Sequence, residues 1–550
     1  MGKSASYDFI IVGGGTSGCV LAERLSADPA HRVLLLEAGR PNRNQLLRMP
    51  MTARNFWTNE KYLWNYRSEP EPGVRGRRIP VPRGKILGGS GAINGMLYAR
   101  GHPRDYDQWR QLGLAGWGYE DVLPYFRRVE HDSRGNTAYH GADGPLGVSR
   151  WPDANPLTPL FAAAARQAGI PFNDDQNGAQ SEGMGVPDLT IDKGERASTY
   201  SAFLRPAMSR PNLTVATLAQ AVRIVIEQGR ATGIEYRRNG TSAVAHAGRE
   251  IVLCGGAYNS PQLLMLSGIG PAAALHRVGI KPVHDLPGVG GNLQDHAGVS
   301  VINHATQPVG LAGNLRWDRL ALNVLRWSVT HDGPVSRMPV VTNGWYRSRP
   351  ELERPDIQTL IGANSPLAGP WFPGIKRPAP PMFTSRSGLQ HPRSRGWMTL
   401  ASADPLDHPR IFFNLFSDPQ DLAVLRYAIR KVREIFAAPS VRHLMGREIT
   451  PGPEVQSDAE LDEFVRTTTT TAYHPVGTCA MGNDADAVVD AQLRVHGIAG
   501  LRVADASIMP TITSGNTNAP CVMIGDKAAA MILGRELPRA ELGPARLAAE

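Results

Sequence analysis

The chain opens with short apolar runs that are separated by glycines and polar residues. Residues 7–12 read Tyr-Asp-Phe-Ile-Ile-Val and residues 32–37 read Arg-Val-Leu-Leu-Leu-Glu, and both runs predict short, mostly buried strands. Between them, residues 19–25 read Cys-Val-Leu-Ala-Glu-Arg-Leu, whose apolar positions have helical spacing. This strand–helix–strand order predicts that the chain begins with an α/β unit.

Glycines fill the loop between the first predicted strand and the helix. Gly13, Gly15 and Gly18 have the spacing G-x-G-x-x-G. In this motif the first glycine makes the tight turn, the second lets a pyrophosphate approach the backbone, and the third lets helix and strand pack closely. Glu37 ends the second strand, where a carboxylate can accept hydrogen bonds from ribose hydroxyls. The segment predicts a dinucleotide site rather than a glycine-rich turn of another α/β fold, and it leaves FAD and NAD both open.

Length and composition narrow the class of protein. A chain of 550 residues predicts two or more domains or one large α/β body. The chain is 42% hydrophobic and 20% charged, which excludes a disordered or coiled-coil protein. No stretch approaches the roughly 20 apolar residues of a membrane span, so we expect no integral membrane segment. The net charge is +9, but the basic residues are spread along the chain, so we expect no nucleic-acid partner.

The cysteines and the N-terminus bear on the compartment. Cys19, Cys254, Cys479 and Cys521 are too few and too scattered for a disulfide framework, and no Cys/His spacing suggests zinc. We therefore expect no metal and a reducing compartment. The polar residues 1–6 run straight into the first strand, so no cleavable signal peptide is expected. These features favour a cytoplasmic protein and leave peripheral attachment to a membrane open.

Further along the chain, several motifs combine glycine with polar residues. The adjacent glycines in residues 83–98 predict a loop that can lie against a flat ring or a pyrophosphate. Within residues 256–270, Pro261 and Gly268 fit the start and the end of a helix. The remaining motifs are Pro-Gly-Val-Gly-Gly-Asn-Leu-Gln-Asp-His at 287–296, Tyr-His-Pro-Val-Gly-Thr-Cys at 473–479, and Val-Ala-Asp-Ala-Ser at 503–507 with Ser-Gly-Asn-Thr-Asn at 514–518.

Taken in order, these motifs resemble those of the glucose–methanol–choline (GMC) oxidoreductase family, from about residue 7 to about residue 535. They are most similar to bacterial FAD-dependent dehydrogenases of aliphatic alcohols, sorbose and polyethylene glycol, and also resemble hydroxymethylfurfural and aryl-alcohol oxidases. The resemblance implies a mixed α/β fold. A Rossmann-like FAD domain would be assembled from discontinuous segments, beside a substrate domain with a large, mostly antiparallel sheet backed by helices. The implied ranges are 1–155, 196–300 and 476–550 for the FAD domain, and 156–195 and 301–475 for the substrate domain.

The resemblance also implies FAD as the cofactor. Its phosphates would lie at the first glycine loop, its ribose at Glu37, its adenine at the backbone of Val222, and its ring near the second glycine loop. The family's choline-oxidising members with covalent FAD carry a histidine where this chain has Ile93, so we predict non-covalent FAD. The residues assigned to FAD are Gly13, Gly15, Thr16, Ser17, Gly18, Glu37, Ala38, Gly88, Gly89, Asn94, Gly95, Met96, Val222, Asp505, Ala506 and Thr517.

Two residues match the family's active-site positions, namely His474 and Asn516. The implied reaction is the oxidation of a primary or secondary alcohol to an aldehyde or ketone, with hydride transfer to flavin N5. A neutral imidazole can take the hydroxyl proton, so His474 is the predicted general base. An amide can donate to the substrate oxygen, so Asn516 is the predicted donor, although Ser-Gly-Asn could also cap a turn. His296 is interpreted as structural or as a support for this site.

The substrate region is less informative. Residues 366–392 are rich in proline and glycine, which predicts an irregular connection or an active-site lid. Choline would need a carboxylate or an aromatic cage, and no acid lies between residues 332 and 351, where a pocket strand is expected. Neutral alcohols are therefore favoured. The residues predicted to bind substrate, for which plain core packing is the alternative, are Tyr473, Trp371, Phe372 and Met338.

The electron acceptor is not readable from the sequence. We predict a quinone-like or dye-like acceptor, with oxygen as the alternative, and a monomer or homodimer acting on a small-molecule alcohol. Three other classes stay open. They are an FAD-containing hydroxynitrile lyase, an NAD-dependent dehydrogenase that uses the same glycine loop, and a non-enzymatic flavin-binding protein.

Overall fold

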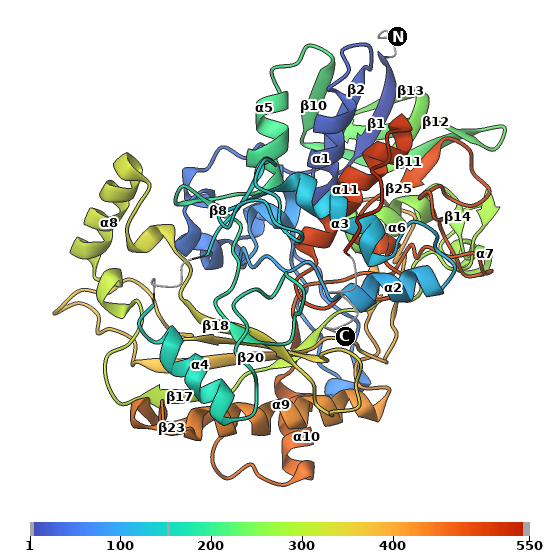
Figure 1. Cartoon of the computed structure of the whole chain (residues 1–550). Helices are drawn as coiled ribbons and strands as arrows, with labels where there is room; N and C mark the ends of the chain where they lie inside the picture. Colours follow the sequence, from blue (N-terminus) through green and yellow to red (C-terminus); the bar gives the residue numbers. More distant parts are fainter. Residues whose placement is uncertain (1–4, 151–154, 543–550) are drawn as a thin grey trace.

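The chain folds around two large sheets (Figure 1). The computed structural model describes residues 5–150 and 155–542. Residues 1–4, which carry part of the expectation about the N-terminus, lie outside the described residues, as do 151–154 and 543–550. Within the described residues, no helix is both long and apolar enough to cross a bilayer.

The first sheet has the strand order β10-β2-β1-β13-β12-β11, with β25 paired to β13. Its parallel part comprises β10, β2, β1, β13 and β25, and β12 and β11 extend it in antiparallel fashion. β2 is buried at all five positions, as expected for a parallel strand covered on both faces. The strands are β1 (Ala5–Val12), β2 (Val33–Glu37), β10 (Leu213–Thr217), β11 (Ala219–Glu227), β12 (Arg230–Arg238), β13 (Thr241–Leu253) and β25 (Leu501–Val503).

Two helices on the first sheet bring distant parts of the chain together. α1 (Thr16–Leu25) leaves the first glycine loop and α11 (Asn518–Leu533) packs beside it. The contact is close, because a Cβ on Gly525 of α11 would lie 2.7 Å from the carbonyl oxygen of Ser17. At their N-terminal ends, the Thr16 hydroxyl donates to the Asn518 amide oxygen at 2.9 Å. The residues just before α11 therefore lie next to the glycine loop.

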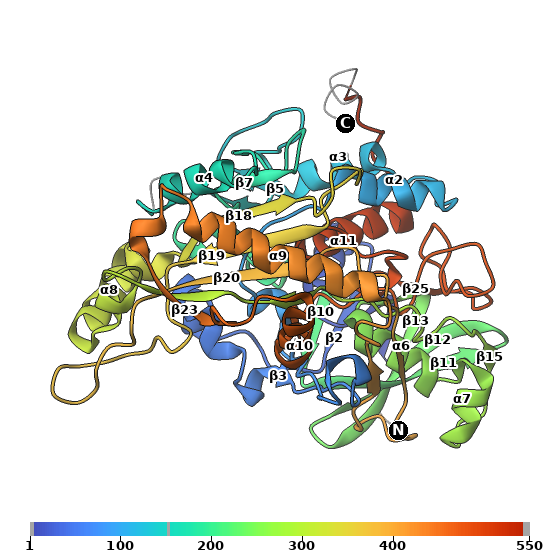
Figure 2. The same cartoon turned by 90° about the horizontal axis from the view of Figure 1, so that it is seen from below.

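The second sheet is antiparallel throughout and has the order β18-β19-β20-β16-β24, with β17 paired to β20 and to β23. α9 (Pro419–Ala437) and α4 (Thr158–Gln167) back one face of it (Figure 2). On that face Phe383 of β20 contacts Phe161 of α4, with ring centroids 5.3 Å apart. The strands are β16 (Ala297–Val299), β17 (Ile302–Ala305), β18 (Val340–Tyr346), β19 (Ile357–Gly362), β20 (Met382–Leu389), β23 (Met445–Thr450) and β24 (Thr470–Thr471).

The remaining helices and strands belong to neither of the two large sheets. The other helices are α2 (Pro103–Gln111), α3 (Tyr119–Val129), α5 (Arg205–Ala207), α6 (Gly256–Leu266), α7 (Ala272–Arg277), α8 (Trp317–Thr330) and α10 (Asp458–Thr468). The short strands are β3 (Leu63–Trp64), β4 (Arg83–Gly84), β5 (Glu130–Asp132), β6 (Leu146–Val148), β7 (Gly183–Gly185), β8 (Ile191–Asp192), β9 (Glu195–Arg196), β14 (Ile269–Gly270), β15 (His284–Asp285), β21 (Trp397–Thr399) and β22 (Arg410–Phe412).

The predicted fold class is confirmed, as are the first strand, helix and second strand at the start of the chain. Two predictions about local structure were wrong. Pro261 lies inside α6 rather than at the start of a helix, because the helix already begins at Gly256. The proline-rich stretch 366–392 is not irregular throughout, because its second half forms β20.

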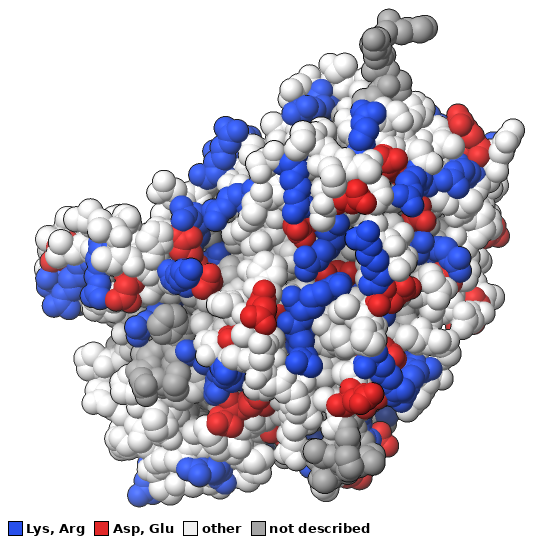
Figure 3. Space-filling model, turned by 45° about the horizontal axis from the view of Figure 1, so that its top comes forward, with Lys and Arg blue, Asp and Glu red and all other residues white. Residues whose placement is uncertain are grey.

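On the face drawn in Figure 3, basic and acidic side chains are interspersed rather than gathered in one stripe.

A buried group of charged side chains lies between α3 and its neighbours. Arg100 and Glu130 form a fully buried ion pair, and His140 lies against Glu130 and Asp132. Burial would raise the pKa of Glu130, but Arg100 and His140 bring it down to about 2. Glu130, Asp132 and His140 are close enough to share a cation, but Arg100 and Arg134 already supply the positive charge there.

Candidate active site

A cavity of about 670 Å³ runs between the two sheets. One end lies at the carboxyl ends of β1, β2 and β13, which is where open α/β sheets bind ligands. The other end lies against β19 and β20 of the second sheet. The cavity therefore joins a nucleotide-type site to a chamber made by the second sheet.

The first glycine loop has the geometry that the motif predicts. Gly13 has φ of +108°, and a Cβ there would lie 2.4 Å from the carbonyl oxygen of Cys254. A Cβ on Gly18 would lie 1.9 Å from the carbonyl oxygen of Gly13, so helix and strand could not pack as they do. A Cβ on Gly15 would meet nothing closer than 3.9 Å. Gly15 lines the cavity, so its missing side chain leaves the backbone open to a phosphate.

Glu37 is placed at the end of β2, on the wall of the cavity. Its carboxylate accepts backbone N–H groups from Gly14 at 2.8 Å and from Gly39 at 2.6 Å. Burial raises the pKa of Glu37 to about 7. Each oxygen keeps a lone pair for a further donor, such as a ribose hydroxyl.

The second glycine loop lies directly on the first. The Gly88 N–H donates to the Gly14 carbonyl at 2.7 Å. A Cβ on Gly89 would lie 2.7 Å from Gly15 Cα, and a Cβ on Gly91 would lie 2.7 Å from Thr16 Oγ1. Larger residues at these positions would force the two loops apart and change the shape of the cavity.

Most residues that the sequence assigned to the cofactor line this cavity. Val222 does not, because it is buried within β11 while the preceding residues 219–221 reach the cavity. Gly18 and Gly88 pack behind the lining, as described above. The assigned residues that line the cavity are Gly13, Gly15, Thr16, Ser17, Glu37, Ala38, Gly89, Asn94, Gly95, Met96, Asp505, Ala506 and Thr517.

Only some of the residues predicted to bind substrate line the cavity. Tyr473 and Met338 line the cavity, whereas Trp371 and Phe372 are not part of its lining. Trp371 lies instead beside the start of α8, where its indole N–H donates to the Ala312 carbonyl at 2.7 Å. The proline-rich stretch thus places both aromatic residues outside the cavity lining.

Several residues of the lining were not found from the sequence. Arg83 and Tyr258 come from motifs that were noted for other residues, and Gln358, Leu360 and Arg386 come from β19 and β20. Burial alternates along residues 357–362 and 383–389. This period of two was the available signal, but the sequence did not show which face of the sheet meets the cavity.

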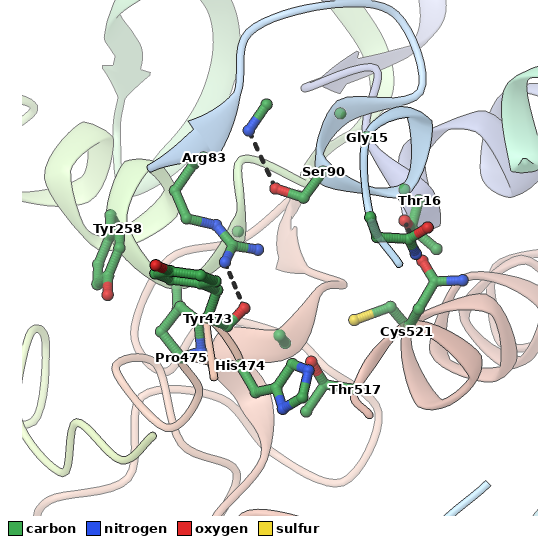
Figure 4. Close-up of a pocket in the computed structure, with 18 of the residues that line it drawn as sticks. Gly15, Thr16, Arg83, Ser90, Tyr258, Tyr473, His474, Pro475, Thr517 and Cys521 are labelled. Carbon is green, nitrogen blue, oxygen red and sulfur yellow. Dashed lines mark hydrogen bonds between the residues drawn. The ribbon is translucent and has the colours of Figure 1, made fainter. Parts of the chain in front are cut away.

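His474 and Asn516 meet in the cavity. His474 Nε2 lies 3.1 Å from the amide nitrogen of Asn516, and both residues line the cavity. On the other side of the imidazole, Nδ1 lies 3.0 Å from Nδ1 of His296. The backbone N–H of His474 donates to Asp295 at 2.9 Å. Residues 294–296 therefore hold the histidine from behind, and Figure 4 shows its ring lying beside Thr517.

These contacts assign the protons on the imidazole. The Asn516 amide nitrogen can only donate, so Nε2 of His474 accepts and carries no proton. Nδ1 then carries the proton and donates to His296. Burial lowers the pKa of His474 well below its usual value, and His296, Arg83 and Arg386 lower it further. The structure thus holds a neutral imidazole whose basic nitrogen faces the cavity.

Tyr473 has an unusual backbone conformation just before the histidine. Its φ is +64°, which is uncommon for a bulky residue. The guanidinium of Arg83 donates to the Tyr473 carbonyl (Figure 4), and the Ala472 N–H donates to the His296 carbonyl at 2.7 Å. These bonds fix the strained turn that aims His474 into the cavity.

Comparison with known proteins identifies the family. The GMC oxidoreductase models match residues 7–298 and residues 392–525. The chain belongs to the GMC oxidoreductase family. It is a flavoprotein oxidoreductase with FAD as its cofactor, and the open backbone at Gly15 and the free acceptor sites of Glu37 fit the phosphates and ribose of such a group.

Similar proteins cover almost the whole chain. Mitochondrial choline dehydrogenase of Mus musculus is 45% identical over 96% of this chain and 89% of its own length. Oxygen-dependent choline dehydrogenase of Sinorhizobium medicae is 44% identical over 96% of both. Pyridoxine 4-oxidase from "Mesorbium loti" has a similar structure, with a TM-score of 0.85 and 32% identity over 95% of this chain and 98% of that one.

The mode of FAD attachment can be tested directly. Ile93 lines the cavity, and its aliphatic side chain offers no nucleophile for a bond to the flavin. We expect acid precipitation of the yellow protein to release all of the colour into the supernatant. Absorbance of the supernatant and the pellet measures this, and flavin kept in the pellet after denaturation would show that the prediction of non-covalent FAD is wrong.

Proposed function

We propose that this protein oxidises a primary or secondary alcohol to an aldehyde or ketone, with His474 as the general base and Asn516 as the donor to the substrate oxygen. The observation that carries the proposal is the 3.1 Å contact between His474 Nε2 and the Asn516 amide nitrogen inside the cavity. An unprotonated acceptor and a fixed donor lie side by side, which is the arrangement that one hydroxyl group needs.

The substrate hydroxyl would replace this mutual contact. It would donate to Nε2 of His474 and accept from the Asn516 amide. Asn516 Oδ1 also accepts from Gln358 at 3.4 Å, so the amide is held with its nitrogen toward the imidazole. FAD, when bound, supplies the acceptor for the hydride from the carbon that bears the hydroxyl.

The proton balance follows from the imidazole. His474 takes the hydroxyl proton on Nε2 and, with Nδ1 already protonated, becomes an imidazolium beside the developing carbonyl. The depressed pKa keeps the base available and makes the imidazolium short-lived. Asn516 stabilises the negative charge on the oxygen while the proton and the hydride leave.

The strand content of the two sheets supports an assignment of the chain segments to two functional domains. We assign the segments 1–155, 196–300 and 476–550 to FAD binding, and 156–195 and 301–475 to substrate binding. The strands of the first sheet all lie in the first set. The second sheet takes its strands from the second set apart from β16, which lies at the end of segment 196–300.

Choline is the second candidate substrate, because two of the most similar relatives are named for it. The lining of the cavity favours an uncharged or anionic alcohol instead. Its carboxylates, Glu37 and Asp505, lie at the ends of first-sheet strands, whereas Arg83 and Arg386 lie near His474. A quinone-like or dye-like electron acceptor remains our first choice, with oxygen as the alternative that the name of the Sinorhizobium relative favours.

One experiment tests the class of reaction. We expect anaerobic addition of the correct alcohol to bleach the flavin absorbance, because the hydride passes to the cofactor. A panel of primary and secondary alcohols is screened by absorbance, and the reduced protein is then mixed with air or with a quinone dye to identify the acceptor. A flavin that no alcohol bleaches would contradict the proposal and favour a non-redox role such as a hydroxynitrile lyase.

A further inference from the structure

We propose that the alcohol substrate carries a carboxylate or similar anionic group and that Arg386 of β20 binds it. This inference rests on the proposed function, because it names the kind of alcohol that the same cavity accepts.

Arg386 stands on the face of the second sheet that meets the cavity. Its neighbours Ser385 and Ser387 are buried on the opposite face, where α4 and α9 pack. In register, Arg386 lies opposite Leu360 of β19, and both residues line the cavity. The guanidinium therefore belongs to the wall of the substrate chamber.

The contacts of this guanidinium place it next to the catalytic histidine. Nη2 donates to the carbonyl oxygens of Thr470 and Thr471, each at 3.1 Å. These two residues precede the strained turn at Tyr473 that carries His474. The positive charge also contributes to the lowered pKa of His474, so the two groups are close enough to interact.

The guanidinium of Arg386 keeps donors that no group of the described residues engages. Among residues 5–150 and 155–542, no carboxylate forms an ion pair with it, and its Nε and Nη1 make no hydrogen bond to the chain. Neither nitrogen is an enclosed atom without a partner, so the unpaired donors open onto the cavity. They are placed to receive a ligand.

The surroundings of the guanidinium compensate its charge only in part, since burial lowers the pKa of Arg386 while the nearby Tyr473 and Asp295 raise it. Arg83 is a second cation near His474. Asp295 lies behind the histidine and already accepts its backbone N–H, and burial raises the pKa of Asp295 to about 7. Burial also raises the pKa of the Tyr473 hydroxyl, which stays neutral. Two guanidinium groups thus face one partly ionised carboxyl group near His474, and the substrate chamber keeps a net positive charge at neutral pH.

A chamber of this kind selects its substrate by charge. A buried arginine without a counter-ion is costly, and an incoming carboxylate removes that cost by accepting two parallel N–H groups. The anchored anion would hold the hydroxyl at the other end of the substrate against His474 and Asn516. A quaternary ammonium group would meet two like charges instead, which is how a site rejects a partner.

The test compares alcohols that differ in charge at constant shape. Choline is paired with 3,3-dimethylbutan-1-ol, and ω-hydroxycarboxylates of increasing chain length are paired with their primary amides. Anaerobic reduction of the flavin in the intact holoenzyme gives the rate and the apparent KM for each. We expect a carboxylate to be the best substrate and choline to be the worst.

Arg386→Gln is expected to lower kcat/KM for the carboxylate by about 10–100-fold, mainly through KM, because a hydrogen-bonded charge pair is lost. The matched amide should change by no more than about 3-fold, as expected once the charged partner is absent. Arg386→Lys keeps the charge and should keep the preference for the anion. Arg349→Gln removes an exposed arginine that is not part of the cavity lining and serves as the matched control.

Each result has a definite meaning. An equal loss for carboxylate and amide would overturn the inference, because Arg386 would then act on the reaction centre or on folding. A wild-type preference for choline, or for the amide over the carboxylate, would also overturn it. In these cases flavin reduction by an alcohol still supports the proposed function, and only a flavin that no alcohol of any charge reduces would remove both.

Discussion

His474→Ala is expected to slow reduction of the flavin by alcohol by about 10²–10⁴-fold while FAD stays bound. The physical reason is the loss of the proton acceptor, since Nε2 of His474 is the unprotonated nitrogen beside the Asn516 amide. Stopped-flow absorbance under anaerobic conditions measures the reduction, and the visible spectrum of the purified variant measures FAD content. Substitution of the exposed His276 on α7 is the matched control and should leave the rate unchanged.

The pH dependence of the wild-type protein gives an independent check on the same residue. Burial and the neighbouring positive charges hold the pKa of His474 well below its usual value. The base therefore stays unprotonated as the pH falls through about 6.5, where a free histidine would take up its proton. We expect the rate of flavin reduction to stay constant across this range.

A near-normal rate of flavin reduction in His474→Ala would show that His474 is not part of the mechanism.

Asn516→Ala is expected to lower the rate of flavin reduction by about 10²–10³-fold, as found when one fixed donor to a developing negative charge is removed. The donor acts mainly as charge develops on the oxygen, so kcat and kcat/KM should fall together. Steady-state and single-turnover kinetics with one alcohol distinguish this from a loss of substrate binding.

A second variant separates catalysis from structure at this position. Asn516→Asp keeps the shape of the side chain but replaces the N–H donor with an acceptor, so it should be at least as slow as Asn516→Ala. Asn483→Ala, at an exposed asparagine, is the control for a general effect on stability. An unchanged rate together with a lower Tm in Asn516→Ala would show that this residue only caps the turn before α11.

The cofactor half of the site could be predicted because its information is local. The turn at Gly13, the open backbone at Gly15 and the close packing at Gly18 are all set within one loop. Glu37 follows on the next strand, and its position at the end of that strand is fixed by the same α/β unit. Short spacings of this kind determine geometry directly, since a strand and a helix each have a characteristic rise per residue and the turn between them is short.

The pair that we propose to be catalytic was predicted by resemblance, but its geometry depends on the tertiary structure. His474 is placed by the pairing of β24 with β16 and by the bonds from residues 294–296. Asn516 is placed by the packing of α11 against α1. The two residues are thus held by different elements, and only the packing of these elements in the folded chain brings Nε2 of His474 to 3.1 Å from the amide nitrogen of Asn516.

The sequence by itself determined the fold class and the nucleotide loop, and it predicted the types of residue that we propose for the chemistry. The tertiary structure alone decided which side chains face the cavity. Trp371 and Phe372 proved to lie outside the cavity lining, while Arg386 proved to belong to it. The reason is that a strand presents alternate residues to opposite faces, and the face that meets the cavity depends on where α4 and α9 pack against the sheet.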